Sequence, residues 1–156
     1  MSEMRVIGIR IEQRNQPVLL LREADGGRYL PIWIGQTEAT AIALEQQGFQ
    51  APRPLTHDLF KDVLAALGHT LVEVRIVDLR EGTFYADLVF DQNVRVSARP
   101  SDSVAIALRV GVPIYAEERV LAEAGLVMPD ESEDEVEKFK EFLESVSPDD
   151  FRATDG

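Results

Sequence analysis

The segment TEATAIAL at residues 37–44 recurs as SDSVAIAL at residues 101–108, an offset of 64 residues. Two further pairs keep the same order along the chain. VLAALG at 63–68 matches VLAEAG at 120–125, and the alternating apolar strand that opens the chain returns 65 residues later. Alanine-rich helices match by chance, but three matching pairs in one order indicate an internal duplication. We therefore expect an α+β fold of two β-β-β-α-α units related by pseudo-two-fold symmetry.

Periodicity and turn residues place the elements of each unit. Alternating apolar residues predict strands, and apolar residues at helical spacing that end before a glycine predict helices. In the first unit we expect strands at 5–12, 17–22 and 29–34 and helices at 37–47 and 56–67. In the second unit we expect strands at 70–79, 83–90 and 94–98 and helices at 101–110 and 117–124.

The composition fits one domain in a reducing compartment. A chain of 156 residues that is 45% apolar can close one hydrophobic core. It contains no cysteine, so disulfides, thiolate chemistry and sulfur-ligated zinc are excluded. Neither a signal peptide nor a run of roughly 20 apolar residues is present. We expect one domain over residues 1–128, a cytoplasmic location and no membrane partner.

The acidic charge is concentrated at the C-terminus. The net charge is −12, of which residues 1–128 carry −4 and residues 129–156 carry −8. Residues 129–134 are an acidic linker, and residues 135–146 place apolar side chains at helical spacing. We expect an amphipathic C-terminal helix that packs on its own domain or on a second copy of the chain.

Polar residues gather where helices are expected to begin. The three clusters are GQTE at 35–38, RPLTHD at 53–58 with Lys61 one turn on, and RPSD at 99–102. A hydroxyl or carboxylate in the first turn stabilises a helix end by roughly 0.3 to 1 kcal/mol, so Glu38, Asp58 and Asp102 each have a capping explanation. Capping requires neither the arginines nor the grouping of His57, Asp58 and Lys61. We expect folding to bring these junction residues from both halves into one water-accessible pocket.

These residue types suit chemistry at a phosphodiester. Glu38, Asp58 and Asp102 would act at the catalytic centre and ligate Mg²⁺ or Mn²⁺, and His57 would move protons near neutral pH. Arg53, Arg99, Lys61 and Ser101 would contact the substrate, the basic groups through its phosphates. Patterns for nucleotide-binding loops, zinc proteases and serine hydrolases are absent from the sequence.

Longer motifs surround the same positions. They are LPIWIG at 30–35 followed by Glu38, RPLTHDL at 53–59, and ARPSD at 98–102 leading into AIAL at 105–108. In this order the motifs resemble the bifunctional nuclease domain family of small bacterial and plant domains, over roughly residues 4–126. The resemblance implies an α+β fold, nuclease activity on RNA and DNA with nucleic acid as the partner, and homodimers.

Two other interpretations remain open. In the first, the same clusters bind a small anion or lock a dimer in a non-catalytic binding or regulatory module, which suits the net acidity. In the second, Trp33 and the apolar stripe around Phe139 and Phe142 are contacts between subunits. Alternation on its strand points Trp33 away from Ile32 and Ile34, toward a second core or a subunit interface.

Overall fold

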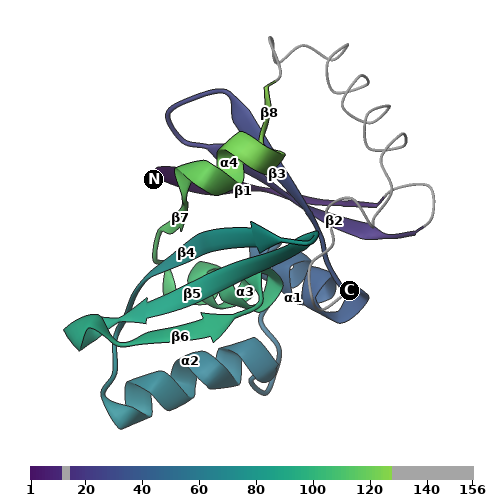
Figure 1. Cartoon of the computed structure of the whole chain (residues 1–156). Helices are drawn as coiled ribbons and strands as arrows, with labels where there is room; N and C mark the ends of the chain where they lie inside the picture. Colours follow the sequence, from purple (N-terminus) through teal and green to yellow (C-terminus); the bar gives the residue numbers. More distant parts are fainter. Residues whose placement is uncertain (12–14, 128–156) are drawn as a thin grey trace.

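A computed structural model describes residues 1–11 and 15–127 as a mixed α and β domain (Figure 1). The strands are β1 (Ser2–Ile11), β2 (Pro17–Glu23), β3 (Arg28–Trp33), β4 (Leu71–Arg80), β5 (Thr83–Phe90), β6 (Arg95–Ala98), β7 (Ile114–Ala116) and β8 (Leu126–Val127). The helices are α1 (Gln36–Gln46), α2 (Thr56–Leu67), α3 (Pro100–Val110) and α4 (Glu118–Ala124), with a short 3-10 turn at Asp91–Asn93.

The eight strands form one sheet in the order β6-β5-β4-β7-β1-β2-β3-β8. Strands β1 to β3 and strands β4 to β6 are two antiparallel meanders. The short strand β7 joins them, because it pairs antiparallel with β1 and parallel with β4. A three-residue strand thus carries the connection between the two meanders.

Helices α1 and α3 cross over the sheet and pack on each other. Helix α1 lies against β1 and β2, α3 lies against β4 and β5, and α2 packs on α3. Helices α2 and α3 end at Gly68 and Gly111, whose φ angles of 76° and 84° are left-handed conformations that glycine adopts without steric cost.

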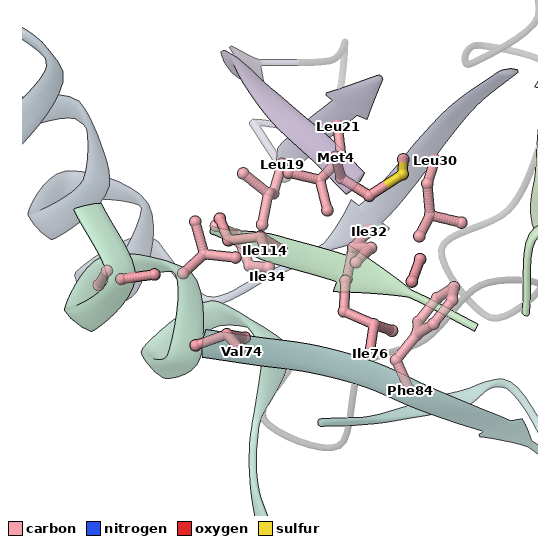
Figure 2. Packing of buried hydrophobic residues seen from close by; sticks show 14 of the residues in the cluster. Met4, Leu19, Leu21, Leu30, Ile32, Ile34, Val74, Ile76, Phe84 and Ile114 are labelled. Carbon is pink, nitrogen blue, oxygen red and sulfur yellow. The ribbon is translucent and has the colours of Figure 1, made fainter. Parts of the chain in front are cut away.

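The main core lies between the sheet and helices α1, α3 and α4. Figure 2 shows side chains from both meanders meeting there, with Ile32 and Ile34 on one side and Val74, Ile76 and Phe84 on the other. The opposite face of the β2–β3 hairpin is also buried, because Val18, Leu20 and Trp33 are almost inaccessible to solvent. The subunit-interface interpretation of Trp33 is therefore wrong, since its side chain lies inside the domain.

The predicted α+β class is confirmed, and ten expected elements appear within three residues of their predicted bounds, the largest difference being the start of β1. Strands β7 and β8 were not predicted, because runs of three and two residues are too short to show a period. The order of three strands followed by helices occurs twice, but the duplication with pseudo-two-fold symmetry stays a prediction. The expected C-terminal helix and the 129–156 appendage lie outside the described residues.

Helix α2 differs from its neighbours because none of its residues is buried. Its apolar residues mark the helix correctly, yet most of them stay exposed and only Leu64 packs against the core. Within the described residues no helix has the length and apolar character needed to cross a membrane.

Candidate functional site

The first turns of three helices converge at one place. Gly35 precedes α1, Leu55 precedes α2 and Arg99 precedes α3, each in an extended conformation. Pro100 occupies the first position of α3, where its missing N–H costs nothing, and it restrains Arg99 to an extended backbone. The local sequence therefore fixes where each helix starts, and the packing of α1 and α2 on α3 brings the starts together.

Four side chains from these turns form a continuous polar chain. His57 Nε2 lies 2.9 Å from Asp102 Oδ1. The second oxygen of Asp102 accepts a hydrogen bond from Arg99 Nε at 2.8 Å and forms an ion pair with Arg99 Nη2 at 2.7 Å. Arg99 Nη2 also donates to Glu38 Oε1 at 3.0 Å. The chain links α1, α2 and α3 and joins residues from both halves of the sequence.

The charge state of Asp102 decides the tautomer of His57. The hydrogen bond from His57 and the guanidinium of Arg99 outweigh partial burial and lower the pKa of Asp102. Asp102 is therefore a carboxylate at neutral pH, and a carboxylate only accepts hydrogen bonds. His57 Nε2 must carry a proton, so Nδ1 is the basic atom of the neutral imidazole.

The polar chain of these four side chains is partly buried and partly exposed to solvent. The side chain of His57 is 12% exposed and that of Arg99 is 38% exposed, with Glu38 and Asp102 between them. Water can therefore reach these side chains. A fully buried network would be expected only to hold the helices together, whereas this one is partly open to solvent.

Asp58 belongs to a second tie that does not include the other two predicted carboxylates. Its Oδ1 accepts from Arg109 Nε at 2.6 Å, and its Oδ2 accepts from the Leu55 amide at 3.0 Å. Burial raises the pKa of Asp58, but these hydrogen bonds and the charge of Arg109 lower it by more. Asp58 thus caps α2 and binds α3 as an ionised group.

Arg109 is a site residue that sequence reasoning missed. Its side chain is only 4% exposed, and besides Asp58 it donates to the carbonyl oxygens of Ala105 and Ala41. It therefore connects all three helices. A charged residue in the otherwise apolar run VAIALRV was the available signal, but the run gives no indication of a partner 51 positions away.

The remaining predicted contacts lie apart from the chain. Arg53 and Lys61 are exposed near the start of α2, where a ligand can approach them. Ser101 is fully buried in the first turn of α3. Its hydroxyl is therefore not accessible to a substrate in this structure.

The carboxylates are not arranged as one metal site. Glu38 and Asp102 bind the same guanidinium, and Asp58 binds a different one. Over residues 1–11 and 15–127, no group of three or more histidine, aspartate or glutamate side chains lies close enough to hold a metal ion. In this arrangement the three predicted ligands do not fit a shared Mg²⁺ or Mn²⁺.

Comparison with known proteins places the site in a family context. The model of the bifunctional nuclease domain matches residues 19–129, which include every residue of the polar chain. An uncharacterized protein of Mycobacterium tuberculosis strain H37Rv is 76% identical over 164 aligned positions, which cover 99% of this chain and all of that protein.

Plant proteins match more distantly. Bifunctional nuclease 1 of Oryza sativa subsp. japonica is 26% identical over 83% of this chain and 41% of its own length. Bifunctional nuclease 2 of Arabidopsis thaliana is 30% identical over 62% of this chain and 31% of its own length. The similarity to the plant proteins is thus confined to less than half of each of them.

Proposed function

This chain belongs to the bifunctional nuclease domain family, and on that basis we propose that its polar chain hydrolyses phosphodiester bonds of RNA and DNA. The observation that carries the proposal is the His57–Asp102 pair. It supplies an imidazole with a defined basic nitrogen, oriented by a carboxylate that is itself held by Arg99. A base with an orienting partner is the minimum equipment for activating a nucleophile.

Activity on both nucleic acids would identify water as the nucleophile, because DNA has no 2′-hydroxyl group. His57 Nδ1 accepts a proton from water as the water oxygen attacks phosphorus. The phosphorus–oxygen bond to one sugar breaks, and the departing oxygen takes up a proton from solvent or from a basic group such as Lys61. Asp102 stabilises the imidazolium that forms, since its carboxylate faces Nε2.

The basic residues divide between the chemistry and the approach of the substrate. Arg99 is neutralised by Glu38 and Asp102, so the polar chain with neutral His57 carries one net negative charge. Attraction of a phosphate backbone must therefore come from outside the polar chain, and in this proposal the exposed Arg53 and Lys61 supply it. In this assignment Arg99 supports the transition state through its remaining exposed face.

Metal assistance is a separate proposal, with Glu38, Asp58 and Asp102 as the ligands. It requires the arginines to release these carboxylates, since Arg99 is paired with Glu38 and Asp102. Asp58 is likewise paired with Arg109. Chelation followed by addition of Mn²⁺ tests the requirement. Loss and recovery of cleavage would support it, and unchanged cleavage would leave the His57–Asp102 chemistry alone.

The decisive test compares His57→Ala and Asp102→Ala with a matched control, His69→Ala. His69 is exposed at the other end of α2 and lies outside the polar chain. We expect the two site variants to lose about 10²-fold or more in cleavage of labelled RNA and DNA oligonucleotides, as removal of a general base does. The control should cleave like the wild type. Equal cleavage by all four proteins would show that the activity is a contaminant.

The non-catalytic alternative has one observation in its favour. Arg99 is already paired with two carboxylates, as expected of a module in which the network only locks three helices together. That alternative predicts no cleavage by the wild type at any protein concentration. It also predicts that Asp102→Ala destabilises the fold without changing any reaction.

A further inference from the structure

Helix α2 presents an apolar face to solvent. Leu59, Phe60, Val63 and Leu67 lie within three turns and are exposed, whereas only Leu64 packs against the core. Such a row is the pattern that normally buries a helix against a neighbour. Within the described residues, the apolar row of α2 is therefore only partly packed against other elements.

Strand β6 leaves a second apolar surface uncovered at the same end of the molecule (Figure 1). It is an edge strand of the sheet. Val94, which precedes the strand, and Val96, which lies in it, are both exposed. Val96 pairs with Leu88, and Leu88 pairs with Val74, so Val96 lies on the face of the sheet that forms the core. The core face thus continues beyond α3 without a cover.

The two apolar surfaces lie at the same end of the molecule (Figure 1), and we name their residues together the α2–β6 face. Its members are between 38% and 68% exposed: Leu59, Phe60, Val63, Leu67, Val94 and Val96. Their exposed apolar area is on the order of 500 Å², as large as the largest patch of a typical monomer. Burial of this area on two partners would reach about 1,000 Å², the lower limit for a specific protein interface.

The chemistry of the face favours a protein over a nucleic acid. Five of its six side chains are aliphatic and cannot stack on bases, which leaves Phe60 as the one aromatic. The neighbouring charges Lys61 and Asp62 balance each other, and Asp58 is neutralised by Arg109. A self-balanced apolar surface is complementary to another copy of itself.

The chain's own C-terminal segment is a poorer fit. Its last described residue, Val127, lies in β8 at the opposite edge of the sheet from β6, about seven strand spacings or ~34 Å away along the sheet. The apolar stripe of that segment begins at Val136, and the nine residues from 128 to 136 span at most about 30 Å when fully extended. The segment also carries eight net negative charges that nothing on this face matches.

We propose that the α2–β6 face is the contact through which two copies of this chain associate, and that this contact holds the His57-bearing helix in place. Helix α2 is tied to its own domain by Leu64 and by the polar bonds of His57 and Asp58. A partner against its apolar row restrains the rest of the helix. Assembly then steadies the His57–Asp102 geometry, a consequence that rests on the proposed function.

The test uses the full-length chain and the double substitution Leu59→Gln with Val63→Gln, which removes apolar surface without changing charge. By light scattering and sedimentation we expect the wild type to have twice the 17.4 kDa mass of one chain. We expect the variant to dissociate at least about tenfold more readily. Its α2 amides should exchange hydrogen faster than those of the wild type. A matched control, Ile11→Gln with Val127→Gln, removes exposed apolar surface at the other half and should stay dimeric.

A further full-length variant, Phe139→Gln with Leu143→Gln, distinguishes the two occupants. Dissociation caused by this variant would assign the contact to the C-terminal segment and overturn the proposal, as would a monomeric wild type or a double variant that remains dimeric. The mass measurements stand whether or not the protein cleaves nucleic acid. If cleavage is present, the Leu59/Val63 variant should lose it on dilution before the wild type does.

Discussion

The two ends of the sheet use similar apolar sequences in opposite ways. At the β2–β3 end, Leu19 and Val18 point to opposite faces and both are buried. At the β6–α2 end, equally apolar residues such as Leu59 and Val96 remain exposed. The first end supplies stability within one chain. The second end carries His57 and leaves surface for another molecule, so a hydrophobic pattern alone does not tell what it packs against.

The same substitution at the two ends should give the largest difference. Leu19→Ala removes a fully buried side chain from the main core and is expected to lower the free energy of unfolding by about 3 kcal/mol. Leu59→Ala should change it by less than about 0.5 kcal/mol at concentrations where the chain is monomeric, because the side chain is already exposed there. Urea unfolding measures both. A similar loss at both positions would show that the face of α2 is buried within one chain.

A smaller effect is expected where α2 is tied to the domain. Arg109→Ala leaves Asp58 without its cation and removes donors from two backbone carbonyls, so we expect a loss of about 2 kcal/mol. Arg109→Lys keeps the charge but not the three separate donors, and should recover only part of the loss. If Arg109 also positions His57, the NMR signals of His57 should shift in Arg109→Ala while those of His69 do not. Unchanged His57 signals would limit Arg109 to a structural role.

The smallest effect concerns acid. The pKa values of Asp58 and Asp102 are lowered in the folded protein, so their stabilisation is complete above the unfolded pKa near 4 and is lost as the pH falls through the folded values. Lowering the pH from about 5 to 3 should therefore reduce the free energy of unfolding of the wild type more than that of Asp102→Asn, which has one such carboxylate fewer. Urea unfolding at each pH measures the difference. Equal pH dependence in the two proteins would mean that Asp102 contributes no acid-sensitive stability.

The fold was largely predictable because its information is local. Alternation identified β5 as residues 83–90, and an apolar stripe closed by Gly68 identified α2 as residues 56–67, both with the bounds observed. Strand β7 was not predictable, since its three residues become a strand only by lying between β1 and β4. The polar clusters at helix starts were recognised as candidates from residue type and position, but their partners were not.

By itself, the sequence of this protein determined which segments become helices and strands, the α+β class, and which junction residues are candidates for a site. Only the tertiary structure decided that His57 meets Asp102 across 45 positions, that Arg99 meets Glu38 across 61, and that Asp58 is taken up by Arg109 instead of joining the other carboxylates. The physical reason is the range of the interactions. Backbone conformation and apolar periodicity are set by near neighbours, whereas the partner of a charged side chain and the cover of an apolar face depend on how whole elements pack.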